Sequence, residues 1–173
     1  MTFIATMTRT RRIASLAVAF CLALPIAAQA APGDPVLDPQ ERALCAQVNG
    51  YRAQHGLTPL KVSVTLTKSS KWLSADMARN DYLDHTDSLG RTFNRRITAF
   101  GYRGGMRSEN VAAGSADAAP TLEQWKQSAP HRKNLLSRSV KVIGIGRAYD
   151  PGSMLGWYWT TTFGGTADRT MPC

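Results

Sequence analysis

Two histidines and one glutamate lie in short polar stretches that could together form a reactive or ligand-binding site. His85, Glu109 and His131 each stand in a loop-prone segment flanked by apolar residues that could anchor it. Two imidazoles and a carboxylate are a competent ligand set for zinc or another divalent metal, with one coordination position left open. The same groups can instead form a metal-free cluster, in which Glu109 accepts a hydrogen bond from one imidazole and fixes its tautomer. Both interpretations require the three side chains to share one solvent-accessible cleft.

Ser128 lies three residues before His131 and is expected at the same cleft. A serine nucleophile activated by that imidazole is one interpretation. However, no G-x-S-x-G turn surrounds the serine, and no acid is clearly placed behind His131. We therefore favour a hydroxyl that caps the end of the preceding helix or bonds the adjacent turn.

Helical patterns occupy the first two thirds of the chain. Asp38-Pro39-Gln40-Glu41 has the residues of a helix start with a capping box, and Gly56 supplies the stop. Apolar residues at helical spacing predict further helices over 63–82, 92–100 and 117–128. These helices would carry the polar segments between them.

The ends of these elements are where the candidate residues fall. His85 comes directly after the second helix, in a loop rich in Asp, Ser and Thr. Glu109 is expected at the entrance of a short strand around Val111. Pro130 prevents the fourth helix from continuing smoothly, so His131 is expected just past the helix end.

Strand patterns fill the last third of the chain. Residues 140–145 form an apolar run, and residues 155–163 alternate with a period of two. Asp150-Pro151-Gly152 between them has turn chemistry. Helices first and a hairpin last predict an α+β fold, in which helices cover an antiparallel sheet, and not a βαβ repeat.

The combination of these motifs resembles the CAP superfamily of cysteine-rich secretory, antigen-five and pathogenesis-related proteins, especially its bacterial branch. The resemblance spans about residues 41–165 and rests on segments that occur in the family's order: 49–57, 82–85, 101–102, 108–112, 125–136 and 142–146. It implies a three-layer α-β-α sandwich with a mainly antiparallel central sheet, formed by one CAP (SCP) domain over residues 38–173.

The resemblance also assigns the site. The two family histidines match His85 and His131, and the first family glutamate matches Glu109. Many members carry a second acid three residues after the tryptophan of the fourth helix, and Ser128 stands at that place here. Members of the family are associated with lipid or sterol binding and with host defence, and some are proposed proteases.

The first 30 residues have the three parts of a secretory signal peptide. These are a basic start with Arg9, Arg11 and Arg12, an apolar run over 13–27, and the cleavage signal Ala28-Gln29-Ala30. We expect residues 31–37 to be a flexible leader. The mature chain would then have no membrane span and would reside in a periplasm or outside the cell.

The chain is basic, with a net charge of +9 that falls to +6 once the three arginines of the signal are removed. A positive chain favours anionic partners such as envelope polymers or lipid headgroups. The basic residues are scattered, without a stripe interleaved with aromatics, so we expect no nucleic-acid partner.

Cys45 and Cys173 are the cysteines that remain after cleavage, because Cys21 lies in the signal. An exported chain with two cysteines usually oxidises them, so we expect a disulfide between the first helix and the last residue. In the chain-entropy model such a long loop stabilises by roughly 4–5 kcal/mol at most.

Three functions agree with these residues. The first is an exported monomer that binds a divalent metal, zinc among them, or a small polar or lipid ligand at the His85, Glu109 and His131 cleft. The second is a metal-dependent hydrolase, protease-like, with Glu109 as base. The third is a basic interaction protein that docks on an anionic envelope polymer. The first is favoured, and catalysis is not expected to be its role.

Overall fold

The computed structural model describes Met1 and residues 33–173. The expected signal peptide therefore lies outside the described residues except for Met1, and so does Cys21. Of the expected leader 31–37, the part from Gly33 on is described, and Leu37 at its end is buried in the core.

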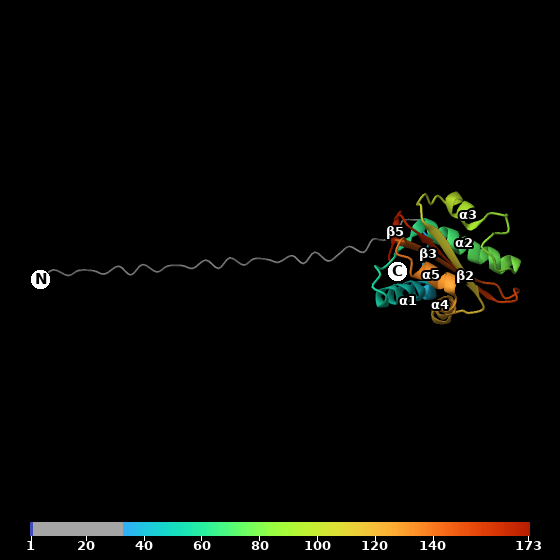
Figure 1. Cartoon of the computed structure of the whole chain (residues 1–173), viewed down its shortest axis with the longest axis horizontal. Helices are drawn as coiled ribbons and strands as arrows, with labels where there is room; N and C mark the ends of the chain where they lie inside the picture. Colours follow the sequence, from blue (N-terminus) through green and yellow to red (C-terminus); the bar gives the residue numbers. More distant parts are fainter. Residues whose placement is uncertain (2–32) are drawn as a thin grey trace.

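Helices come first and strands gather late in the chain, as the sequence predicts (Figure 1). The elements are α1 (Pro39–Gln54), β1 (Lys61–Ser63), α2 (Val64–Asn80), α3 (Phe93–Ala99), β2 (Arg107–Ala113), α4 (Ala118–Gln127), α5 (Ala129–Leu135), β3 (Val142–Tyr149), β4 (Trp157–Gly164) and β5 (Thr170–Met171). Among the described residues, no helix is both long and apolar enough to cross a membrane.

The five strands form one sheet in the order β2-β4-β3-β1-β5. The β1–β3 pair is parallel, and the other three pairs are antiparallel. The sheet is thus mixed and mainly antiparallel. The parallel pair is possible because α2, α3, β2, α4 and α5 lie between β1 and β3 in the chain and provide the long crossover that parallel strands need.

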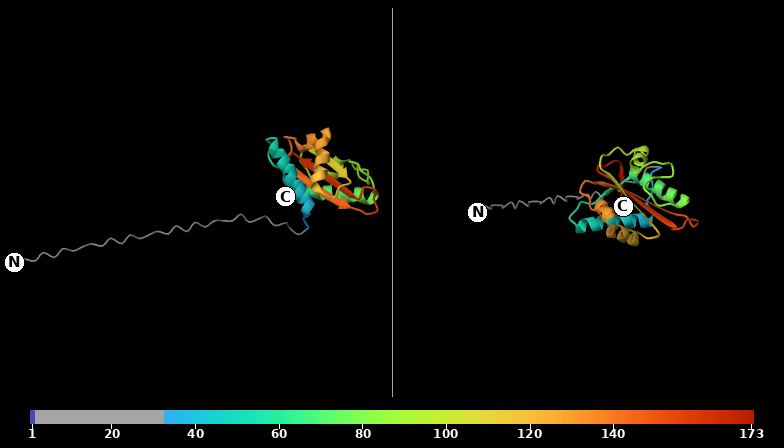
Figure 2. Two further views of the ribbon diagram at one scale, coloured as in Figure 1. Left: turned by 90° about the horizontal axis from the view of Figure 1, so that it is seen from below. Right: turned by 45° about the vertical axis from the view of Figure 1, so that its right-hand side comes forward.

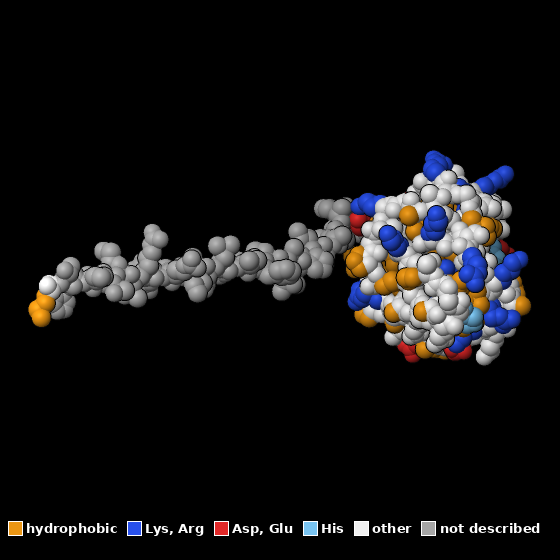
Figure 3. All heavy atoms as spheres, turned by 60° about the vertical axis from the view of Figure 1, so that its left-hand side comes forward, with side chains coloured by type: hydrophobic (Ala, Val, Ile, Leu, Met, Phe, Trp, Pro, Cys, Tyr) orange, Lys and Arg blue, Asp and Glu red, His pale blue; other side chains and the backbone are white. Residues whose placement is uncertain are grey.

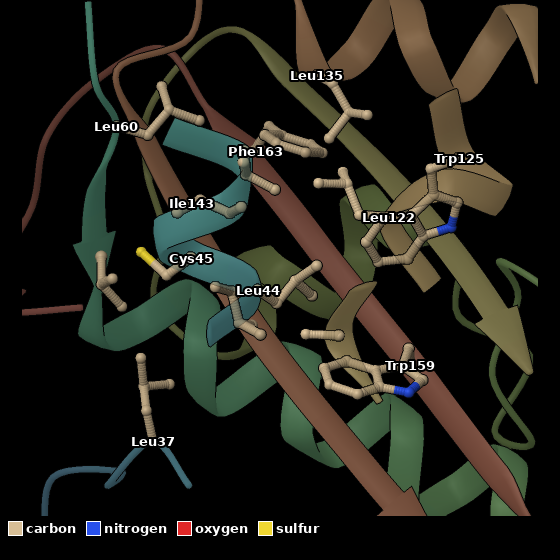
Figure 4. Close-up of a cluster of buried hydrophobic side chains, with 14 of the residues drawn as sticks. Leu37, Leu44, Cys45, Leu60, Leu122, Trp125, Leu135, Ile143, Trp159 and Phe163 are labelled. Atoms are coloured by element: carbon tan, nitrogen blue, oxygen red, sulfur yellow. The ribbon is translucent and has the colours of Figure 1, made fainter. Parts of the chain in front are cut away.

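Helices cover both faces of this sheet. Helices α2 and α3 lie on one side, and α1, α4 and α5 lie on the other (Figures 1 and 2). This confirms the predicted α+β class and the three-layer α-β-α sandwich. Figure 4 shows the larger core, in which side chains of α1, α4 and α5 point toward Ile143, Trp159 and Phe163 of the sheet.

The opposite face has its own core. Leu73 and Met77 of α2 pack with Val111 and Tyr158 of the sheet. Because both faces are covered, β4 is buried from Tyr158 to Gly164, on both sides of the strand. Helix α2 lies so close to β3 that a Cβ built on Gly146 would come within 2.3 Å of the backbone of α2.

The capping box predicted for α1 is present. Asp38 Oδ1 accepts hydrogen bonds from the backbone N–H groups of Gln40 (2.8 Å) and Glu41 (2.9 Å). In return, Glu41 Oε2 accepts one from Asp38 N–H at 2.8 Å. Cys45 of the same helix forms the predicted disulfide with Cys173, with their Cα atoms 5.6 Å apart.

The region around Pro130 differs from the prediction. Helix α4 ends at Gln127 and Ser128 is extended, but a new helix, α5, begins at Ala129. A proline in a first helical turn costs nothing there, because the N–H that it lacks would have no partner in the helix. His131 therefore lies within α5, and the prediction that it lies beyond a helix was wrong.

Candidate functional site

The structure brings His85 and Glu109 into direct contact. His85 lies in the loop after α2, and Glu109 lies third in β2 and not at the strand entrance as predicted. The ring nitrogen Nδ1 of His85 is 3.0 Å from Glu109 Oε1. The side chain of His85 is 46% exposed, whereas that of Glu109 is 1% exposed. The buried glutamate thus orients an imidazole that is accessible to solvent.

A buried arginine balances the charge of Glu109. Arg96 of α3 is fully buried, and its guanidinium donates a hydrogen bond to Glu109 Oε2. A second guanidinium nitrogen of Arg96 donates to the backbone carbonyl of His85 at 3.0 Å. Thr162 Oγ1, 3.4 Å from the same Oε2, adds a hydrogen bond from β4. Arg96 therefore fixes both the carboxylate and the loop that carries His85.

The same loop is anchored at a second point by Asp76 of α2. Its carboxylate accepts hydrogen bonds from Ser88 N–H (2.9 Å), from the Ser88 hydroxyl (2.6 Å) and from the phenol of Tyr82. Burial alone raises the pKa of Asp76, but the hydrogen bonds of Ser88 and Tyr82 outweigh it and lower that pKa. Tyr82 and Ser88, which lie on either side of His85 in the chain, are thus both bound to the carboxylate of Asp76. These bonds restrict the position of His85.

Two asparagines, Asn110 and Asn134, connect the helix that carries His131 to the strand that carries Glu109. Asn110 of β2 donates to the backbone carbonyl of His131 at 3.1 Å. Asn134 donates to Asn110 Oδ1 (2.8 Å) and to the carbonyl of Glu109 (3.2 Å). Since β2 is an edge strand, these bonds attach α5 to the sheet beside the glutamate. The Nδ1 atom of His131 is buried and has no hydrogen-bond partner among the described residues.

The pKa values of the two imidazoles are shifted in opposite directions. The hydrogen bond to Glu109 raises the pKa of His85, although burial opposes it. Burial and the nearby charge of His85 lower the pKa of His131. Both shifts favour the positive charge on His85 and not on His131.

A pocket of about 250 Å³ opens at this place, lined by His85, Phe93, Arg107, Ser108, Glu109 and Asn134. A larger pocket of about 350 Å³ lies at the far end of the sheet, beside Leu60, Met171 and Cys173. It contains no histidine or acidic side chain. Two other pockets, of about 340 and 350 Å³, contain aspartates but no histidine. The pocket at His85 is therefore distinguished by combining an imidazole with a carboxylate.

His131 is not among the residues that line the site pocket, and neither is Ser128. Ser128 lies at the joint of α4 and α5, half-buried, and its side chain makes no capping hydrogen bond to α5. Glu123, the nearest acid along the chain, is exposed and pairs with Lys126 at 2.6 Å. Neither residue supplies the second acid of the family pattern.

The trio does not fit a three-ligand metal site as it lies. Within residues 33–173, no group of three or more His, Cys, Asp and Glu side chains is arranged to hold a metal ion. Both carboxylate oxygens of Glu109 already have partners, since Oε1 contacts His85 and Oε2 accepts hydrogen bonds from Arg96 and Thr162. The carboxylate behaves as a partner that orients an imidazole, in the manner of the groups behind metal-bound histidines.

Arg96 is the residue that the sequence reasoning missed. It stands three residues after Phe93 and four before Phe100, so helical spacing places it on their inward side, whereas Arg95 is exposed. This spacing can be read from the sequence. However, Arg95-Arg96 looks like an exposed basic pair until the ion pair of Arg96 with Glu109 is known.

Comparison with known proteins agrees with this architecture. Residues 46–163 match the family described as "CAP: Cysteine-rich secretory protein family". The chain belongs to the CAP family. Bacillus subtilis YkwD is 32% identical over 124 residues, which cover 71% of this CAP chain and 46% of YkwD. The membrane protein YlbC of the same species is 26% identical over 106 residues, 61% of this chain and 31% of YlbC. The chain thus spans less than half the length of these curated relatives.

Solved structures show the same fold. An extracellular protein with an SCP domain from Bacillus anthracis has a TM-score of 0.66 and 26% identity, covering 76% of this chain and 45% of that one. An outer surface protein of Borrelia burgdorferi has a TM-score of 0.66 and 22% identity, covering 76% of this chain and 97% of its own. The second likeness concerns the fold alone.

Proposed function

We propose that this CAP domain is exported and acts as a binding module, which holds a small polar ligand at the cleft of His85, Glu109 and His131. One observation carries the proposal: a half-exposed imidazole at a pocket is held by a buried glutamate, which a buried arginine neutralises. Such an arrangement fixes the ring while leaving Nε2 of His85 free to meet a ligand.

Export is supported by the basic start, apolar run and A-x-A site of the first 30 residues. The likeness to an extracellular SCP-domain protein supports it as well. We propose a periplasmic or extracellular location on these grounds.

A divalent metal such as zinc is the second occupant to be tested. Its ligands would be the two imidazoles, with Glu109 oriented behind His85 and not bound to the metal. Hydrolysis has less support from the geometry, because a general base needs a free carboxylate and Glu109 is ion-paired with the fully buried Arg96.

Docking on an anionic polymer is supported by the net positive charge alone, which is +9 for the whole sequence and +6 without the three arginines of the expected signal. Figure 3 shows Lys and Arg side chains distributed over the visible face without a continuous stripe. A scattered charge attracts many polyanions weakly, whereas the pocket at His85 can select a ligand.

The test is native mass spectrometry of the natively exported full chain, with parallel elemental analysis of bound metals. We expect a co-purifying small molecule or metal in the wild type and its loss in the double variant His85→Ala/His131→Ala. His55→Ala is the matched control, because His55 is exposed and bonds its own helix at Tyr51. A bound species that survives the double variant, or a wild type that carries and binds nothing, would contradict the proposal.

A further inference from the structure

We propose that the pocket beside His85 selects a small anionic group, a carboxylate or a phosphate, in preference to a metal ion. The inference rests on the proposed binding function and names the class of ligand. It follows from the charges around the pocket, from one cation without an acidic partner, and from one buried hydroxyl without a partner.

The elements that border the pocket are strongly basic. Helix α3, strand β2 and helix α5 together carry a single acid, Glu109, and the following basic residues: Arg95, Arg96, Arg107, Arg132 and Lys133. Arg96 already neutralises Glu109. These elements carry a net positive formal charge, which favours an anion over a divalent cation beside them.

Arg107 lines the pocket and brings a charge that no carboxylate balances. Its guanidinium donates to the carbonyl of Gly104 (2.7 Å), the hydroxyl of Thr98 (2.7 Å) and the carbonyl of Tyr102 (3.2 Å). It also donates to the carbonyl of Asn94 at 3.4 Å. All four acceptors are neutral, and Arg107 takes part in none of the ion pairs within the described residues. Because these bonds already fix the guanidinium, a ligand would not have to order the Arg107 side chain on binding.

The other acids near His85 offset that charge only in part, since the charge of Asp84 helps to raise the pKa of His85. Asp87 is buried and pairs with Arg91 at 2.8 Å and with Arg96 at 3.9 Å. Asp84 is exposed, lies outside this pocket, and accepts a hydrogen bond from the backbone of Thr86 at 2.6 Å. Neither carboxylate faces the pocket as a free ligand for a cation.

Ser108 adds a hydrogen-bond donor to the same pocket. Its Oγ atom is buried and has no hydrogen-bond partner among the described residues. A buried hydroxyl without a partner is unfavourable, and an oxygen of a carboxylate or phosphate would accept a hydrogen bond from it. A cation cannot accept a hydrogen bond, so this group also favours an anion.

The size of the pocket limits the ligand. Its volume of about 250 Å³ is below the range typical of whole drug-sized ligands. Phe93 provides an apolar wall beside Arg107. A single anionic group with a short apolar attachment fits these features, either as a free acid or as the headgroup of a lipid.

The experiment measures the affinity of the full mature chain for five probes at constant ionic strength, by protein NMR titration. Hexanoate and hexanol differ only in the charged group. Inorganic phosphate and dihexanoyl phosphatidylglycerol, below its micelle concentration, distinguish a free phosphate from a lipid headgroup. Zinc chloride tests the metal in a separate buffer.

We expect hexanoate to bind at least about tenfold more tightly than hexanol, with amide shifts at Ser108 and Glu109. Arg107→Gln should weaken hexanoate binding by about tenfold and leave hexanol unaffected. Arg103→Gln, which removes one exposed charge outside this pocket, should leave both unaffected. Ser108→Ala, a change that should fold normally, should weaken hexanoate by about threefold.

Equal affinity for hexanoate and hexanol would overturn the inference, and so would equal loss in Arg107→Gln and Arg103→Gln. If zinc or hexanol binds at His85 while hexanoate and both phosphates do not, the anion is excluded and the binding function stands. If none of the five probes binds, both proposals fail. Phosphate and the phosphatidylglycerol each support the inference, and the tighter of the two identifies the source.

Discussion

Glu41 and Glu109 are both buried carboxylates neutralised by a cation, but their surroundings differ. Glu41 of α1 contacts Lys71 Nζ at 2.6 and 2.5 Å and accepts the backbone N–H groups of Asp38 (2.8 Å) and Arg147 (3.0 Å). Glu109 is bound by side chains, among them the half-exposed His85. Glu41 thus links α1 to α2 and β3, whereas Glu109 links the buried Arg96 to a histidine that lines a pocket.

A buried ion pair therefore does not by itself mark a functional site. Both pairs are costly to bury and therefore constrain the fold. The Glu41 partners are mainly backbone groups, which any sequence must satisfy. Glu109 instead contacts the imidazole of His85, which lines a pocket where a ligand could bind.

The largest effect is expected from Arg96→Met, which leaves Glu109 buried without its cation. We expect a loss of about 3–5 kcal/mol in the free energy of unfolding, measured by urea denaturation at pH 7. The exposed neighbour provides the control, since Arg95→Met should change stability by no more than about 0.5 kcal/mol. Equal losses in the two variants would mean that the Arg96 pair contributes nothing specific.

Glu41→Gln should cost less, about 1–3 kcal/mol, because Lys71 is 31% exposed and can turn to water. The amide oxygen can still accept one of the two backbone N–H groups that bind the carboxylate. The imidazole NMR signals of His85 should not move. A shift of those signals would show that the two networks are coupled and would remove the contrast between them.

The histidine titrations sharpen the contrast further. By NMR, His85 should titrate above 6.5 and His131 below it, in line with the directions of their pKa shifts. Glu109→Gln should lower the pKa of His85, whereas Glu123→Gln, which changes an exposed carboxylate, should not. An unchanged His85 pKa in Glu109→Gln would show that the glutamate does not hold the ring in solution.

The sign of the effect on stability follows from the same shifts. The raised pKa of His85 contributes stability that is fully present below pH 6.5 and is lost as pH rises through the folded-state value. The lowered pKa of His131 acts in the opposite sense, so stability falls as pH drops below 6.5. The Glu109→Gln variant should lose the first contribution and keep the second.

The smallest effect on stability is expected from His85→Ala. Glu109 keeps Arg96 and Thr162, and the imidazole is already half-exposed, so the change should cost no more than about 1 kcal/mol. Thermal unfolding beside His55→Ala provides the measurement. A large loss would place His85 among the residues that hold the fold and not among those that meet a ligand.

The sequence predicts the elements with local signals. The capping box at Asp38 and the apolar spacing over 63–82 each depend on residues within a few turns of one another, and both helices are present. The disulfide follows from cysteine count and export, and the sandwich follows from the resemblance to the CAP family.

The rest depends on contacts between distant residues. Strands β1 and β5 are too short, at three and two residues, to carry a pattern, and they exist because they pair across the sheet. The role of Arg96 depends on a carboxylate 13 residues away that only the fold brings near. For the same reason the sequence could not show that Ser128 and His131, three residues apart, are both absent from the lining of the pocket.

The most direct test of the account locates binding on the full chain. A mixture of small acids, alcohols and amines is added while the backbone amide signals are followed by NMR. The account predicts saturable shifts at His85, Glu109 and Asn134 that vanish in His85→Ala. Saturable shifts gathered instead at Leu60 and Met171, around the larger pocket, would contradict it.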